Sequence, residues 1–365
     1  MAIEVLTQDA LESGRRSGAR SSSTRLYALQ EALSIVFRSD TEMAGRKRNY
    51  DGYRVHIHLE RHLSSGMMLP TLSFWCFDPG EGMLSLFDMK IRSILLTSGT
   101  LSPLGGFAEE LCTPFNVRLE NPHVIDKSQI WVGVVPKGPQ GHTLNSSFKT
   151  RNESSYKQDL GNAIVNFARI VPDGLLVFFP SYGVLKSCIE AWKDIGQGGA
   201  SVWERICQYK SPVVEPKDSA TFASVAEDFK SKLDSSSAHG AVFFGVCRGK
   251  ASEGLDFSDR AGRGVIITGI PFATLTDAKV KIKKEVMDSK LFKSKKRPAS
   301  GSDANQDELI SGDSWYVQQA IRAVNQAIGR VIRHKEDYGA ILLCDERFSG
   351  QVCFYICSVM HGNTG

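Results

Sequence analysis

The chain has 365 residues, of which 42% are hydrophobic and 23% are charged, and its formal net charge is +4. This length allows one large or two ordinary globular domains, and the composition is ordinary for a globular protein. The net charge is too small to indicate nucleic-acid binding by itself. The eight cysteines include no C-x-x-C pair, which argues against a disulfide scaffold and against a zinc ribbon.

Neither a membrane segment nor a secretory signal is apparent in the sequence. No apolar run approaches the length of a membrane span, and the N-terminus lacks the apolar stretch of a signal peptide. Scattered cysteines are consistent with reduced thiols in the cytosol or nucleus. We therefore expect a soluble intracellular protein with no membrane partner.

The N-terminal part of the chain is predicted to be a partly disordered segment that contains one helix, at residues 24–37. Further along, "HIHLERH" alternates apolar and polar side chains, which is typical of a surface strand. His56, His58 and His62, with Cys76 downstream, fit that strand better than a zinc site. We predict no metal site from these residues.

From residue 92 onward, short apolar runs alternate with helical stretches. Most runs are uninterrupted, which is typical of strands that are covered on both faces. The predicted strands lie at residues 92–97, 130–135, 174–179, 241–247, 264–270 and 339–344, and the predicted helices at about 154–170, 182–194, 222–233 and 314–334. This alternation predicts an α/β fold with a parallel sheet flanked by helices, in which functional loops follow the carboxyl ends of the strands.

One segment departs from this pattern. Residues 288–313 change from basic to acidic and are rich in Ser, Gly and Asp, which predicts a disordered insertion. Its basic "KSKKRP" run has the composition of a nuclear import signal, although a run this short is more often a charged loop.

The segment "GVCRGKAS" resembles a phosphate-binding loop but does not match one. The spacing of Gly245, Gly249 and Lys250 is one residue too short, and Ala251 replaces the hydroxyl that would bind magnesium. A complete ATP site is therefore not predicted within this chain.

The overlapping segment "GKASEGLDF" follows a predicted buried strand and is more specific. Glycines such as Gly254 allow backbone amides to approach a phosphate or a sugar closely. Glu253 and Asp256 add carboxylates, and Asp256 could accept hydrogen bonds from a ribose or orient an arginine. The alternative is that Asp256 only caps the segment that follows it.

Three polar turns follow predicted strands, and their hydroxyl, amide and cationic groups suit contacts with a phosphate backbone. The candidate DNA contacts are Thr97, Ser98, Gly99, Thr100, Ser181, Tyr182, Arg248, Lys250 and Ser252. Ordinary helix caps and turns are equally consistent with the first two turns.

The predicted helix at residues 314–334 has two distinct faces. Its apolar stripe consists of Ile321, Val324, Ile328, Val331 and Ile332. Gln326, Arg330 and Arg333 lie roughly opposite, with Gly329 between them. A solvated face is the simple alternative, because Arg and Gln are good helix formers.

Taken in order, several motifs resemble those of superfamily 2 DNA helicases of the xeroderma pigmentosum group D (XPD) type. They are "ILLTSGTLSPL", "LLVFFPSY", "GKASEGLDFSD", "VIITGIPF" and "QAIGRVIRHKEDYGAILLCDERF". The resemblance covers about residues 50–348. It implies the end of an arch-domain insertion at residues 1–70, a RecA-like second motor domain at residues 71–348, and a divergent tail at residues 349–365.

The resemblance also implies roles for the candidate residues. ATP with Mg²⁺ would lie between two motor domains, and Arg330 and Arg333, with Gln326, would act on its phosphates. The ATP site would further include Gly329, Glu253, Gly254 and Asp256. The three polar turns would contact single-stranded or forked DNA. The implied function is that of the C-terminal motor half of an ATP-dependent 5′-to-3′ DNA helicase of the nucleus, in DNA repair and telomere maintenance.

The chain departs from the family pattern in what it lacks. We find no phosphate loop, no magnesium-binding acids and none of the four cysteines of the family's iron–sulfur cluster. We therefore predict that the isolated chain is inactive and needs the first motor domain as its partner. The alternative function is a truncated, non-catalytic module that binds single-stranded DNA or regulates another protein.

Overall fold

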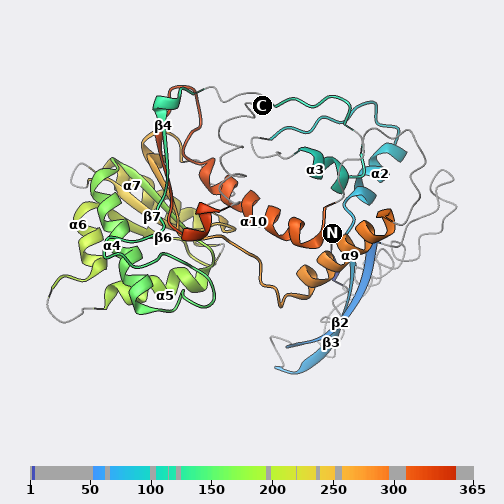
Figure 1. The fold of residues 1–365 in the computed structure, drawn as a ribbon, viewed down its shortest axis with the longest axis horizontal. Coiled ribbons are helices and arrows are strands. Elements are labelled where there is room, and N and C mark those ends of the chain that lie inside the picture. The colour runs from blue at the N-terminus through green and yellow to red at the C-terminus, as the bar shows by residue number, and fades with distance from the viewer. Residues whose placement is uncertain are drawn as a thin grey trace, which may run out of the picture. The chain divides into compact units, whose positions relative to one another are not determined.

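The computed structural model describes eleven segments of the chain. They are residues 2–4, 52–61, 66–98, 104–113, 115–120, 125–194, 199–218, 220–235, 239–250, 257–295 and 310–350. The chain divides into two compact units, which are described separately (Figure 1). Unit 1 contains Met1–Thr97, Leu101–Arg118 and Leu275–Asp313, and unit 2 contains Ser98–Thr100, Leu119–Thr274 and Ser314–Gly365.

Unit 2 is built around a six-stranded sheet in which every neighbouring pair of strands is parallel. The strand order is β4-β9-β8-β5-β7-β6. The bounds are β4 Ile130–Val134, β5 Gly174–Phe179, β6 Ser211–Val214, β7 Ala241–Val246, β8 Gly264–Ile267 and β9 Gly339–Leu343. Every residue of β5, β7 and β8 is buried. This burial explains why their sequences are uninterrupted apolar runs, and it confirms the predicted fold class.

Helices cover both faces of this sheet, and the two apolar clusters of unit 2 show which helix packs on which face. Alternate residues of β5 and β7 pack with α4 (Ser154–Ile170), α5 (Tyr182–Lys193) and α6 (Val202–Tyr209), which gather on one side in Figure 1. The intervening residues pack with α7 (Phe222–Asp234) and α10 (Gly312–Ile328). Phe179 thus belongs to one cluster and Phe178 to the other, as strand alternation requires.

Three short 3-10 helices complete unit 2. They are η4 Lys127–Gln129, η5 Asp259–Gly262 and η6 Glu346–Ser349. Because η5 immediately precedes β8 and η6 immediately follows β9, the first lies at the amino edge of the parallel sheet and the second at its carboxyl edge.

The described part of unit 1 contains a three-stranded antiparallel sheet in the order β1-β3-β2 and three helices. The bounds are β1 Ala2–Glu4, β2 Tyr53–Arg61, β3 Met68–Cys76, α2 Gly80–Asp88, α3 Leu104–Glu110 and α9 Ala278–Lys295. Helix α9 is held by two lysines: Lys283 donates to the Phe77 carbonyl, and Lys290 forms an ion pair with Asp78. Among the described helices, none is long and apolar enough to cross a membrane.

Several predicted elements differ from the structure. Residues 92–97 form no strand, and Leu95 is 81% exposed; an apolar run becomes a strand only where it finds a hydrogen-bonding neighbour. Disorder was wrongly predicted for residues 288–295, which continue α9, because Lys and Leu are good helix formers. The predicted helix at residues 24–37 lies outside the described residues.

The end of α10 is the most consequential difference. The helix was predicted to run to residue 334, but it ends at Ile328. The apolar stripe is nevertheless buried as predicted, since Ile321, Val324, Ile328 and Val331 are each less than 9% exposed. Val331 reaches the same apolar cluster from the segment beyond the helix.

The burial of Ile328 yields a stability prediction. Ile328→Asp should lower the free energy of unfolding by more than about 3 kcal/mol, because it buries an unpaired carboxylate. Gln326→Asp is the matched control, since Gln326 is exposed on the same turn, and its cost should stay below about 1 kcal/mol. Urea unfolding followed by circular dichroism measures both values. Equal losses for the two variants would contradict the assigned burial of Ile328.

Candidate functional site

The segment after α10, residues 329–338, contains both candidate arginines. Turn hydrogen bonds close the helix end, where the Arg330 amide donates to the Ala327 carbonyl and the Val331 amide to the Ile328 carbonyl. The segment then leads directly into β9. Arg330 and Arg333 lie beyond the end of α10. The prediction that they share a helical face with Gln326 is therefore wrong.

A buried carboxylate fixes the shape of this segment. The side chain of Asp337 is fully buried, and its Oδ1 accepts from Arg263 Nη1 at 2.5 Å. Its Oδ2 accepts from the Arg333 amide at 3.2 Å, and the Tyr338 amide donates to Oδ1. Arg263 also stacks over the Tyr338 ring, with 4.0 Å between the guanidinium carbon and the ring centroid. These contacts hold the backbone of Arg333 in a defined place.

The segment has two further attachments. Gln129 Nε2, on η4, donates to the carbonyls of Lys335 and Asp337, each at 2.8 Å. On the other side, η5 approaches closely: a Cβ at Gly262 would lie 3.0 Å from the Arg330 carbonyl oxygen. Glycine at position 262 therefore permits the contact between η5 and the arginine segment.

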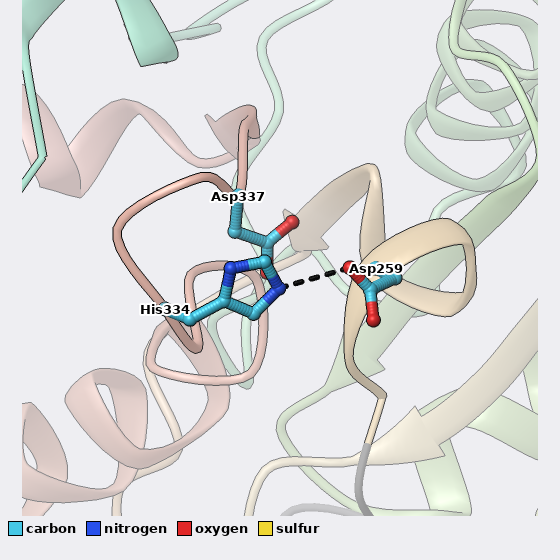
Figure 2. A group of neighbouring side chains, drawn as sticks. All are labelled: Asp259, His334 and Asp337. Atoms are coloured by element: carbon cyan, nitrogen blue, oxygen red, sulfur yellow. Dashed lines mark hydrogen bonds and ion pairs between the residues drawn. The ribbon is translucent and has the colours of Figure 1, made fainter.

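Figure 2 shows His334 facing Asp259 of η5, with Asp337 beside it. His334 Nε2 and Asp259 Oδ1 are 2.9 Å apart, and possible ligand atoms of all three residues lie within 4.8 Å of one another. This is the one group among the described residues that could hold a metal ion. Asp337 already accepts from Arg263, however, and a guanidinium repels a divalent cation. We interpret the group as a hydrogen-bonded attachment between η5 and the arginine segment.

The candidate arginines differ in exposure. Arg330 is half-buried, whereas Arg333 and Gln326 are exposed. Gly329 faces the end of its own helix. Among the described residues, a Cβ placed there would lie 3.3 Å from the Asn325 carbonyl oxygen and 3.8 Å from the Gln326 carbonyl oxygen. The other predicted ATP-site residues, Glu253, Gly254 and Asp256, lie outside the described residues.

Of the candidate DNA contacts, Ser181 and Tyr182 follow β5. Ser181 is the N-cap of α5 and accepts from the Val184 amide at 3.4 Å, so its hydroxyl has the ordinary capping role that the sequence allowed. The Tyr182 hydroxyl donates to Glu215 Oε1 at 3.1 Å. Burial, with the nearby Glu215 charge, raises the pKa of Tyr182 to about 12, so the phenol remains protonated.

Glu215, which no sequence motif singled out, connects this turn to the one after β7. It is 3% exposed, and its Oε2 accepts from the Val246 amide at 2.8 Å. A Cβ at Gly249 would collide with Glu215 Oε1, so a larger residue there would displace the carboxylate. Glu215 therefore positions the backbone that carries Arg248 and Lys250. A lone glutamate after a short strand gave no signal that could have revealed this role.

The remaining DNA candidates are only partly described. Arg248 is exposed and Lys250 is half-buried, both directly after β7. Thr97 and Ser98 are exposed in an extended segment. Gly99, Thr100 and Ser252 lie outside the described residues.

The two candidate sets within unit 2 lie at opposite edges of the parallel sheet. Ser181, Tyr182, Arg248 and Lys250 follow β5 and β7 and occupy the carboxyl edge. The arginine segment precedes β9 and contacts η5, which precedes β8, so it occupies the amino edge. The candidate arginines thus lie away from the carboxyl edge, where we expected the functional loops.

An iron–sulfur cluster does not fit the described residues. Their six cysteines are free thiols, and no cysteine belongs to the one candidate metal group among them. Cys188, Cys247 and Cys344 are buried, and burial raises the pKa of each to about 12. Such thiols are apolar core residues and not thiolate ligands.

Comparison with known proteins identifies the family. A helicase C-terminal domain model matches residues 164–353, and a model described as "RTEL1 helicase, ARCH domain" matches residues 1–79. The chain is 52% identical over 354 residues to a regulator of telomere elongation helicase 1 homolog of Oryza sativa subsp. japonica, covering 94% of this chain and 33% of the relative. It is 42% identical to the Rattus norvegicus regulator, covering 95% of this chain and 28% of the relative.

Solved structures show the same fold. One named "XPD_Helicase" superposes with a TM-score of 0.53 at 20% identity, over 80% of this chain and 45% of that chain. Another, named "XPD_APO", gives a TM-score of 0.50 at 20% identity, over 80% and 52%. This chain spans about a third of the length of the curated relatives. The chain belongs to the helicase C-terminal domain family and is similar in sequence to the regulators of telomere elongation helicase.

Proposed function

We propose that this chain supplies the second, RecA-like motor half of an ATP-dependent 5′-to-3′ DNA helicase, in which ATP hydrolysis drives translocation on a single strand. The observation that carries the proposal is the arginine segment. In a chain of a helicase family, two arginines lie three residues apart, and the backbone of Arg333 is held by Asp337, which pairs with Arg263. We further propose a nuclear role in DNA repair and telomere maintenance, in keeping with the names of the relatives.

The proposed chemistry of the arginines is electrostatic. A guanidinium donates through a planar fork and can bridge two phosphate oxygens, which stabilises the charge that develops during phosphoryl transfer. Such an arginine contributes about three to five orders of magnitude in rate in well-studied nucleotide hydrolases. Arg330 and Arg333 would supply this charge, and Gln326 would add a polar contact. The first motor domain would hold the magnesium ion, which neutralises phosphate charge.

The turn after β7 supports the division of the ATP site between two domains. A phosphate loop needs free backbone amides, but the Val246 amide donates to Glu215, whose carboxylate also packs against Gly249. We therefore expect no ATP turnover from the isolated chain. The same observation favours the second candidate function, a non-catalytic module that binds single-stranded DNA.

The central test is to replace the arginines in a longer helicase chain that also contains the first motor domain, called the longer helicase below. Arg330→Ala should lower the rate of ATP hydrolysis by about three orders of magnitude or more, because the charge acts mainly in the transition state. Arg333→Ala should behave similarly, and the double variant should cost less than the sum if both arginines act on one phosphate. Steady-state ATPase assays with single-stranded DNA measure these rates.

Two controls accompany that test. Lysine at position 330 should not restore turnover, because a point charge does not reproduce the fork. Binding of single-stranded DNA should remain nearly unchanged, since the DNA candidates of unit 2 lie at the other edge of the sheet. Near-normal ATP hydrolysis by Arg330→Ala would show that this side chain is merely solvated, and the proposal would fail.

DNA binding by the present chain is a separate prediction. Arg248→Ala with Lys250→Ala should weaken binding to a single strand of any sequence, because two cations no longer reach the phosphates. The slope of log K against log salt should become shallower by about 0.7 for each phosphate that the protein no longer neutralises. Fluorescence anisotropy with labelled oligonucleotides at several salt concentrations gives both quantities. An affinity and a salt slope identical to those of the unsubstituted chain would remove these residues from the DNA surface.

A further inference from the structure

An exposed aromatic ring lies at the carboxyl edge of the unit 2 sheet, in the turn at residues 145–151. The side chain of Phe148 is 78% exposed. The Arg151 guanidinium carbon lies over its ring, 4.8 Å from the ring centroid. Single exposed apolar side chains are common on protein surfaces, so the support and the surroundings of this ring decide whether it has a role.

The turn that carries Phe148 is fixed by its own hydrogen bonds. The Ser147 amide donates to Asn145 Oδ1 at 2.9 Å, and Thr150 Oγ1 donates to the Asn145 carbonyl at 2.6 Å. The hydroxyls of Ser147 and Thr150 are 3.0 Å apart, and one donates to the other. These bonds define the backbone on both sides of the ring.

The same turn is attached to the end of β9. The amide and hydroxyl of Ser146 both donate to the fully buried Asp345, at 2.9 and 3.0 Å, and Arg347 donates to the Ser146 hydroxyl at 2.7 Å. Asn145 donates to Glu346 at 2.7 Å. Phe148 is therefore presented on a rigid support, which lowers the entropy cost of binding a ligand there.

The turn also adjoins the proposed DNA surface. Gly269, just after β8, lies between the two: a Cβ there would collide with Ser146 Oγ and would lie 3.1 Å from Pro180 Cγ. Pro180 directly precedes Ser181 and Tyr182. The Phe148 turn is thus continuous with the turns at the carboxyl edge to which phosphate contacts are assigned.

We propose that Phe148 is a stacking platform for a base of a single-stranded nucleic acid, an inference that rests on the proposed function. Arg151 covers one face of the ring, and the base stacks on the other. Phe148 is the only apolar side chain among residues 145–152, and Lys149 and Arg151 flank it. A base next to phosphates fits this combination of one aromatic and two cations better than an apolar protein surface does.

Variants of the present chain test the proposal by anisotropy with labelled oligo(dT). Phe148→Ala and Phe148→Leu should each weaken binding about tenfold, because leucine has no π-face, whereas Phe148→Tyr should bind like the unsubstituted chain. With an abasic strand, which keeps the phosphates, all four proteins should bind equally. Trp131→Ala is the control and should bind oligo(dT) like the unsubstituted chain. Trp131 is also an exposed aromatic, at 57%, but it lies on edge strand β4.

The other outcomes distinguish the stacking proposal for Phe148 from the proposed DNA surface that contains Arg248 and Lys250. Unchanged oligo(dT) binding by Phe148→Ala, together with weakened binding by Arg248→Ala, would overturn the stacking platform and leave the DNA surface standing. Absence of binding by the unsubstituted chain at low salt would overturn both. If Phe148→Ala leaves DNA binding intact but lowers the melting temperature of the longer helicase, the ring packs against protein and the stacking inference is wrong.

Discussion

The buried carboxylate of Asp337 is the constraint on which the candidate catalytic segment depends. A buried charge is costly unless it is paired and hydrogen-bonded, and Asp337 meets both conditions through Arg263 and two backbone amides. Removing either partner would leave the other charge buried and unpaired. The pair therefore specifies one conformation for residues 329–338, and with it the position from which Arg330 and Arg333 extend.

The candidate residues of unit 2 lie at two opposite edges of the sheet. The arginine segment lies at the amino edge, whereas Glu215 organises the turns with Tyr182, Arg248 and Lys250 at the carboxyl edge. Rigid, fully buried strands connect the two edges. In the proposed helicase, a change at the nucleotide would reach the DNA through this sheet and the helices packed on it, and not through direct contact between the two sets of residues.

The sequence predicted the fold well where burial on both faces dictates composition. β5 and β7 are uninterrupted apolar runs because each of their residues is buried. The end of α10 was predicted wrongly because Val331 is buried beyond the helix and so continues the apolar periodicity. Gly329 offered a stop signal, since glycine commonly follows the last helical residue.

Tertiary contacts explain what the sequence could not show. No spacing in the sequence singled out Glu215 or Asp337. The role of Glu215 appears only through its contacts with Tyr182 and the Val246 amide, and the role of Asp337 only through its contacts with Arg263 and two backbone amides. At Leu95 and Leu96 the sequence predicted a strand that the structure does not contain. An apolar composition favours a strand, but it does not show whether a neighbouring strand is there to form the hydrogen bonds. Local patterns thus located the arginines, whereas the long-range carboxylate contacts that position them required the structure.

The most direct test of this account is the rate of ATP hydrolysis by the longer helicase carrying Asp337→Asn. It should be measured below the melting temperature of the variant, because the substitution leaves Arg263 unpaired. If Asp337 positions the arginine segment, kcat should fall at least about tenfold, and the Kd for single-stranded DNA should stay within about twofold. A folded variant with normal kcat, or one that loses ATP hydrolysis and DNA affinity equally, would contradict the account.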